Sequence, residues 1–135
     1  MYRISDSTLF IDDRKKIHDY LVSRGVKDST YLDFIKNNKL GILESNLCSA
    51  GGFDFGISHF FGISKVSGYD IIAANKNLKT DEGNIVSIGL IEGDDVICLC
   101  IENNEIFLWM IINGNGETIK VANSFDELLE LITIE

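Results

Sequence analysis

The sequence predicts one α+β domain over residues 1–135, with N-terminal helices and a C-terminal helix packed on a mostly antiparallel sheet. The length fits one domain and leaves little room for two. Helical spacing of apolar residues is clearest before residue 40 and after residue 123. Between them, short β-rich segments alternate with turn-forming residues, which is typical of antiparallel strands joined by tight connections.

Two helices are expected first. One covers about residues 12–23, and Gly25 stands where a C-terminal cap belongs. The other covers about residues 30–38, where Thr30 followed by Asp33 resembles a capping box. Each segment carries its apolar residues at helical spacing, so each helix should bury one face.

The middle of the chain has weaker signals. Residues 41–56 are expected to be a loop because glycines interrupt them, and their glycine-rich part lacks the phosphate-binding patterns. Residues 57–63 predict a short strand, and residues 69–77 a short helix or turn. Residues 79–84 are polar and expected to be exposed.

A buried hairpin is the clearest prediction. Val96–Ile101 and Ile106–Ile112 are apolar runs, and Asn103-Asn104 between them suits a two-residue type I′ turn, since asparagine tolerates positive φ. Neither run alternates apolar with polar residues, so both strands should lie centrally in the sheet with both faces covered. The predicted register pairs Cys98 with Trp109, Leu99 with Leu108 and Cys100 with Phe107.

Further elements flank this hairpin. A β-rich strand is expected at residues 85–88, before the turn signal of residues 93–95. A second tight turn at residues 113–116 leads into a strand over residues 118–122. The closing helix should begin after Ser124, which with Glu127 forms a capping box. Its buried stripe would be Phe125, Leu128, Leu129 and Ile132.

No residue pattern indicates a metal, a cofactor or a catalytic centre. Cys98 and Cys100 would share one face of a strand, but a closed zinc site needs four ligands, and the other candidates, Cys48, His18 and His59, are unpaired in sequence. The cysteines are therefore interpreted as core residues. Neither histidine belongs to a known catalytic motif. Trp109 lies in so apolar a run that burial is expected.

Charge is distributed unevenly. The formal net charge is -9, with a balance of +2 over residues 1–40 and -11 over residues 41–135. Such a field repels nucleic acid and anionic membranes and attracts a basic partner, although acidity can also serve solubility alone. The candidate partner contacts are acids near the predicted turns: Glu92, Asp94, Asp95, Glu102 and Glu105.

Location is inferred from absent signals. The longest unbroken apolar run is far shorter than the roughly 20 residues of a membrane span, and no basic stretch followed by apolar residues marks a signal peptide. The three cysteines make an odd count without disulfide-framework spacing. A reducing, cytoplasmic location is expected.

The second half resembles the SUKH superfamily, which includes yeast cell-wall-synthesis regulators and many bacterial immunity proteins. The resemblance rests on order: the strand Ile85–Gly89, the Gly93-Asp94 turn with the strand Val96–Leu99, the strand Ile106–Trp109, and the helix of Ser124–Leu129. Residues 69–78 suit the preceding segment, and coverage is roughly residues 50–134. The usual Leu-Pro after the first helix is absent, and residues 29–31 are a loose substitute.

The resemblance implies a SUKH-like α+β fold and a protein-binding role. Bacterial members are implied to be antitoxins that block a polymorphic toxin, frequently a nuclease, whose basic surface would suit this acidic chain. The leading hypothesis is therefore a non-catalytic immunity protein. The alternatives are a regulatory or scaffold domain with a cellular partner and, less favoured, an enzyme or small-ligand binder, which would need a concave polar pocket. The sequence leaves the partner and the oligomeric state open.

Overall fold

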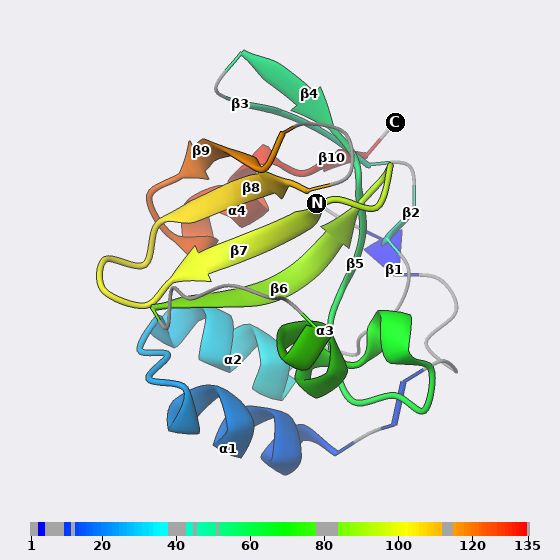
Figure 1. The fold of residues 1–135 in the computed structure, drawn as a ribbon, viewed down its shortest axis with the longest axis vertical. Helices are drawn as coiled ribbons and strands as arrows, with labels where there is room; N and C mark the ends of the chain where they lie inside the picture. The colour runs from blue at the N-terminus through cyan, green and yellow to red at the C-terminus, as the bar shows by residue number, and fades with distance from the viewer. Residues whose placement is uncertain are drawn as a thin grey trace.

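A five-stranded antiparallel sheet in the order β5-β6-β7-β8-β9 is the largest sheet in the described part of the protein (Figure 1). The structure is a computed structural model that describes residues 3–4, 10–11, 13–37, 43–44, 46–50, 52–77, 84–111 and 115–134. The strands of this sheet are β5 (Ile57–Phe60), β6 (Ile85–Ile91), β7 (Val96–Cys100), β8 (Ile106–Met110) and β9 (Glu117–Ala122). The predicted α+β class, with helices from both ends of the chain on a mostly antiparallel sheet, is confirmed.

Two smaller sheets lie beside it. One pairs β1 (Arg3–Ile4) with β2 (Leu43–Glu44). The other has the order β10-β3-β4, from β10 (Thr133–Ile134), β3 (Asn46–Ala50) and β4 (Phe53–Phe55). The prediction that residues 41–56 form a loop is therefore wrong. One of the glycines that suggested a loop, Gly52, lies in the turn of the β3–β4 hairpin, where its φ is +76°.

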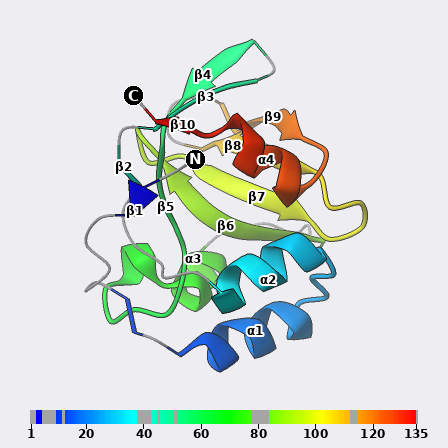
Figure 2. The same cartoon turned by 180° about the vertical axis from the view of Figure 1, so that it is seen from behind.

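Helices cover one face of the large sheet. Figure 2 shows α2 (Ser29–Asn37) and α4 (Phe125–Leu131) on the same side of it, with α1 (Arg14–Ser23) outside α2. On the other side of β5 and β6 lie the short helix η2 (Ser67–Tyr69) and α3 (Ile71–Asn77), where the sequence predicted a helix or turn.

An aromatic cluster joins the helices to the sheet. The ring of Phe125 lies 4.8 Å from that of Tyr31, 5.1 Å from that of Phe34 and 5.4 Å from that of Phe60, measured between centroids. All four side chains are buried. These contacts bring α2, α4 and β5 together, and aromatic pairs at such distances add to the free energy of burial.

Gly25 follows α1 with a φ of +91°, as expected for the predicted C-terminal cap, and the predicted N-cap of α4 is also found, but that of α2 is not. Ser124 Oγ accepts a hydrogen bond from the Glu127 N–H at 3.2 Å, as predicted. The cap of α2 is Asp28, because its Oδ1 accepts from the Tyr31 N–H at 3.2 Å, so the predicted Thr30–Asp33 capping box is wrong. The second oxygen of Asp28 accepts from the Phe125 N–H at 3.1 Å, so one carboxylate caps both α2 and α4.

The β7–β8 hairpin forms, but its register differs from the predicted one by two residues. Cys98 pairs with Phe107, not with Trp109. The turn is longer than type I′: the Asn104 N–H donates to the Cys100 C=O at 2.9 Å, and of the two asparagines only Asn104 has positive φ. Because side chains alternate with a period of two, this shift leaves every side chain on its predicted face. The other observed pairs are Val96 with Trp109, Ile97 with Leu108 and Leu99 with Ile106.

The prediction that both faces of the hairpin are buried is confirmed for one face and wrong for the other. Leu99 and Leu108 are 0% exposed, and both strands lie inside the sheet. On the second face Cys98 is buried, but Phe107 and Trp109 are only half-buried, so β8 is not fully covered there. The predicted exposure of residues 79–83 and part of the predicted turn at 113–116 fall outside the described residues.

The first residues of β6 are not paired with β5, and side chains form hydrogen bonds with the backbone along this edge instead. Asn75 Oδ1 accepts from the Ser87 N–H at 2.7 Å, and Asn75 Nδ2 donates to the Ser87 C=O at 2.9 Å. The Arg24 guanidinium donates to the Ile85 C=O at 3.0 Å. The buried backbone groups of this edge therefore keep their hydrogen bonds without a neighbouring strand.

Candidate functional site: an acidic groove

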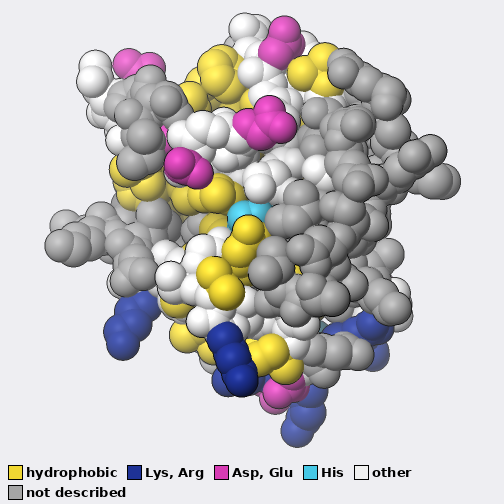
Figure 3. Space-filling view, turned by 90° about the vertical axis from the view of Figure 1, so that its right-hand side faces the viewer, with side chains coloured by type: hydrophobic (Ala, Val, Ile, Leu, Met, Phe, Trp, Pro, Cys, Tyr) yellow, Lys and Arg dark blue, Asp and Glu magenta, His cyan; other side chains and the backbone are white. Residues whose placement is uncertain are grey.

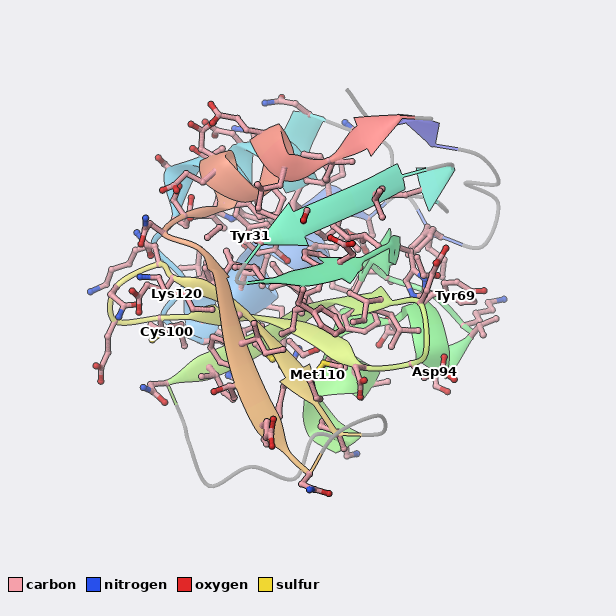
Figure 4. All side chains as sticks on the ribbon, turned by 90° about the horizontal axis from the view of Figure 1, so that it is seen from above. Tyr31, Tyr69, Asp94, Cys100, Met110 and Lys120 are labelled. Atoms are coloured by element: carbon pink, nitrogen blue, oxygen red, sulfur yellow. The ribbon has the colours of Figure 1, made fainter. Side chains whose placement is uncertain are left out.

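A groove lies between the β3–β4 hairpin and the turn that joins β6 to β7. It encloses about 280 Å³, and Figure 4 shows β4 on the side of β3 that faces the labelled Met110 and Asp94. Residues 53–56 form one wall, Ile91, Glu92, Gly93 and Asp95 form the other, and Met110 lies at the end of β8. We call this the acidic groove, because its exposed rim carries carboxylates while much of its lining is apolar.

The β4 wall alternates aromatic and acidic side chains. Phe53 and Phe55 stack with centroids 6.5 Å apart and planes 19° apart. Phe55 is buried and Phe53 half-buried, whereas Asp54 between them is exposed. Asp54 Oδ1 accepts a hydrogen bond of 2.6 Å from the hydroxyl of its cross-strand partner Ser49. This hydrogen bond orients the carboxylate without removing its charge.

The opposite wall is the β6–β7 turn. The Asp94 N–H donates to the Ile91 C=O at 3.1 Å, and positive φ values of 96° at Gly93 and 72° at Asp94 reverse the chain. The Glu92 N–H donates to the Gly56 C=O at 2.8 Å, which ties the turn to the end of β4. A side chain at Gly56 would come within 2.9 Å of the Glu92 carboxylate, so glycine leaves the space in which that carboxylate lies.

The five acidic residues that were predicted to contact a partner lie in different parts of the molecule. Glu92 is exposed and lines the groove, and Asp94 is exposed in the same turn. Asp95 is 0% exposed, so the prediction that it is an exposed acid is wrong. It immediately precedes β7, and its C=O accepts from the Ile91 N–H at 2.9 Å, which closes the turn.

Glu102 and Glu105 lie at the opposite end of the hairpin. The strand β7 separates them from the groove by about 17 Å, the length of a five-residue strand. Glu105 forms an ion pair with Lys120, and this hydrogen-bonded lysine lowers the pKa of the Glu105 carboxyl. Glu102 is exposed. The five acids thus do not form one patch, and the groove holds only those of the β6–β7 turn.

Basic side chains gather at the far end of the molecule. Arg14, Lys15, His18 and Lys36 of α1 and α2 surround a shallow hollow of about 250 Å³. In Figure 3 most acidic side chains lie in the upper half of the visible face and the lysine and arginine side chains in the lower half. The charge asymmetry between the two parts of the sequence is therefore also an asymmetry in space.

His59 is buried beside the sheet. Its Nε2 lies 2.8 Å from the Gly68 carbonyl, which only accepts, so Nε2 carries a proton and Nδ1 accepts from the Ser58 hydroxyl at 2.9 Å. The rings of Phe10, Phe61 and Tyr69 surround it. Burial lowers the pKa of the imidazole, and the hydrogen bond to Gly68 partly opposes this effect. These contacts fix a neutral histidine in the core.

Cys48 and Cys98 are buried, as predicted for core residues, whereas Cys100 is only half-buried. Burial raises the pKa of the Cys98 thiol to about 12 and that of the Cys48 thiol to about 11, which disfavours the reactive thiolate. Within the described ranges, histidine, cysteine and acidic side chains nowhere gather in threes around a point that could hold a metal ion. None of the helices in these ranges is both long and apolar enough to cross a membrane.

Sequence reasoning missed the β4 side of the groove. The three-residue alternation of Phe53, Asp54 and Phe55 is the signal of a half-buried strand, but it is short and stands between glycines. Gly56 was read as a breaker, whereas it makes room for Glu92. Asp54 therefore joins Glu92 as an exposed acid that lines the groove.

Comparison with known protein families identifies a family that contains most of this chain. The model of the SMI1 / KNR4 family (SUKH-1) matches residues 28–131. This segment begins at Asp28, the cap of α2, and ends with α4, so it contains both walls of the acidic groove and leaves out α1. No curated protein and no solved structure matches the sequence.

Proposed function

This chain belongs to the SMI1 / KNR4 family (SUKH-1), and on that premise we propose that it is a non-catalytic protein-binding domain whose partner presents a basic surface to the acidic groove. The observation that carries the proposal is the groove itself. The exposed residues Asp54 and Glu92 line a partly apolar hollow, and the exposed Asp94 lies in the β6–β7 turn that forms one wall. A partly apolar centre with a polar rim is the usual anatomy of a protein interface.

The finer proposal is an immunity protein of the cytoplasm that neutralises a toxin by direct binding. The partner would be a basic toxin domain, such as a nuclease, whose phosphate-binding surface is positive. Occlusion of that surface would block the toxin without any chemistry by this chain. The negative field around the groove would raise the association rate, because opposite charges steer the encounter. The same field disfavours nucleic acid and anionic membranes as partners.

The absence of catalysis is part of the proposal. Ser58 and His59 are in hydrogen-bonding contact, but the group that orients the imidazole is the Gly68 carbonyl, not a carboxylate. His59 is only 3% exposed. Both features support a structural role for this pair.

Co-expression with the product of the neighbouring gene tests the proposal. We expect the two proteins to co-purify at low salt and the cells to be protected from that product. If they neither associate nor protect, the immunity role is wrong. If the neighbouring gene encodes no toxin and the chain instead co-purifies with a cellular protein, the regulatory or scaffold role replaces it.

Charge variants locate the binding site within the complex. Glu92→Gln with Asp94→Asn removes two charges from the groove, and asparagine tolerates the positive φ at position 94. The matched control is Glu102→Gln with Glu105→Gln at the far end of the hairpin. We expect the groove pair to slow association about tenfold at low salt and the control pair to change it much less. Equal effects would exclude the groove as the contact.

A further inference from the structure

The outer edge of β4 carries no further strand in the part of the chain that the structure describes, because β4 ends the order β10-β3-β4. Figure 4 shows this edge on the side toward Met110 and Asp94, which is the side of the acidic groove. An unpaired strand edge presents backbone N–H and C=O groups to which a second chain can add as a strand. The groove therefore offers backbone groups as well as carboxylates.

The hydrogen bond of Gly56 indicates which backbone groups face the groove. Its C=O accepts from the Glu92 N–H at 2.8 Å, so the polar groups of Gly56 point toward the β6–β7 turn. In an extended chain, residues two apart direct their N–H and C=O groups to the same side. Asp54 therefore directs its N–H and C=O into the groove, whereas Phe53 and Phe55 direct theirs toward β3.

We propose that the groove binds an extended segment of a basic partner, which adds to β4 as a short strand with alternating apolar and basic side chains. A strand paired with β4 places its basic side chains beside Asp54 on one face and its apolar side chains beside Phe53 and Phe55 on the other. The end of that strand reaches Glu92 and Asp94 at the far wall. This inference rests on the proposed function and specifies how the basic partner is held.

The dimensions of the groove favour a strand over a helix. Its volume of about 280 Å³ is lined along one wall by only four consecutive residues, 53–56. Three residues of β4 offer an edge of about 10 Å, which suits three residues of an added strand. A helix, roughly 10–12 Å across with its side chains, would not bring backbone groups to the Asp54 N–H.

Charge complementarity selects a basic segment. Exposed acids lie on both walls, and no lysine or arginine is among the residues that line the groove. The formal net charge of the whole chain is -9, so a cationic segment gains from the overall field as well as from these neighbours. An acidic segment of the same apolar pattern would meet repulsion at the same positions.

The discriminating variant is Asp54→Pro. Proline removes the N–H that points into the groove, and since this N–H takes no part in pairing with β3, the hairpin keeps its hydrogen bonds. Asp54→Ala removes the same carboxylate and keeps the N–H, so it is the matched control. Thermal melts of both variants establish that they fold.

The probe is the blocked peptide Val-Arg-Val-Arg-Val, titrated into the ¹⁵N-labelled protein, with Val-Glu-Val-Glu-Val as its charge control. We expect the arginine peptide to shift the amide resonances of residues 53–56 and to slow hydrogen exchange at the Asp54 amide. The Kd should rise about tenfold from Asp54→Ala to Asp54→Pro, as expected for one lost backbone hydrogen bond. Equal Kd values for the two variants, or equal binding of both peptides, would overturn the proposal.

A second peptide replaces the proline variant if that variant does not fold, and binding to the neighbouring gene's product separates the strand addition from the proposed function. If Asp54→Pro does not fold, an arginine peptide N-methylated on the residues that would face β4 replaces it, and undiminished binding of that peptide to the unmodified protein overturns the proposal. If the neighbouring gene's product binds this protein while the arginine peptide leaves the Asp54 amide unchanged, the strand addition is wrong and the proposed function stands. Peptide binding without any complex with that product supports the strand addition and removes the proposed function.

Discussion

Asp28 and Phe125 are joined by a hydrogen bond of 3.1 Å between the carboxylate of one and the backbone N–H of the other, across 97 residues of sequence. The other oxygen of Asp28 accepts from the Tyr31 N–H, so the same side chain caps α2 and α4. Asp28 is 5% exposed. A buried carboxylate held by two helix N-termini is favoured by both helix dipoles and leaves neither N–H without an acceptor.

The first prediction concerns this double cap. Asp28→Ala removes both acceptors, and we expect it to lower the free energy of unfolding by about 2–4 kcal/mol. Asp28→Asn keeps one carbonyl oxygen and should cost about half as much. Asp33→Ala is the control, because Asp33 is exposed on the same helix and caps nothing. Urea unfolding measures all three, and a loss at Asp33 as large as at Asp28 would contradict the assignment of the cap.

The second prediction concerns the Tyr31 hydroxyl. It is buried and has no hydrogen-bond partner among the described residues, and burial, followed by the nearby negative charge of Asp28, raises the pKa of the phenol. Tyr31→Phe removes the unsatisfied group and keeps the ring against Phe125, so the free energy of unfolding should rise by about 1 kcal/mol. Chemical denaturation at pH 7 measures the change. A clear loss of stability would mean that the hydroxyl has a partner, such as an internal water.

The third prediction concerns Asn75 at the edge of β6. Asn75→Ala would leave the buried Ser87 N–H without its acceptor and the Ser87 C=O without its donor. We expect a loss of about 2–3 kcal/mol. Lys76→Ala, exposed on the same helix, should change stability by less than about 0.5 kcal/mol. Faster amide exchange of Ser87 in the Asn75 variant would show that the edge, and not the helix alone, has been opened.

The fourth prediction is a loss of stability on acidification that depends on His59. Its pKa is lowered in the folded protein, so the unfolded chain binds the proton more readily. The stabilisation is therefore complete above the unfolded pKa of about 6.5 and falls as the pH drops below it, by up to about 1.4 kcal/mol per pH unit. Below the pKa of His59 in the folded protein, both states bind the proton, so this residue no longer makes stability depend on pH.

The histidine variants separate this effect from general acid denaturation. His59→Gln cannot take up the proton, so the slope of stability against pH below about 6.5 should become shallower, whatever its stability at pH 7. His18→Gln, at a histidine whose side chain is 44% exposed, is the matched control. Denaturant titrations at half-unit steps from pH 7.5 to pH 5 make the comparison. An unchanged slope in His59→Gln would show that other groups cause the loss.

The elements predicted correctly are those whose signals lie within a few neighbouring residues. Ser124 caps α4 because its hydroxyl accepts from an N–H three residues away, and the apolar runs of β7 and β8 correctly predict the burial of Leu99 and Leu108. Side-chain facing in the hairpin was also predictable, since it depends only on odd and even positions. These features need no knowledge of the rest of the chain.

The features that could not be predicted depend on distant residues or on a choice between similar turns. The cap of α2 at Asp28 is completed by Phe125, so the local pattern of Thr30 and Asp33 was misleading. Asn103-Asn104 suits both a two-residue and a four-residue turn, and the longer one forms. At the site, Glu92 and Asp94 were found from their turn, but Asp54 was missed because β4 is only three residues long.

The bond between Asp28 and Phe125 also bears on how the protein is made. A ribosome delivers the chain from its N-terminus at about 5–20 residues per second, so Phe125 is synthesised roughly 5–20 s after Asp28. During that interval α2 has its own N-cap but lacks α4, and the rings of Tyr31 and Phe34 lack the Phe125 ring. The newly made segment that contains α2 would thus expose an aromatic surface until Phe125 has been synthesised, which makes it a natural substrate for chaperones.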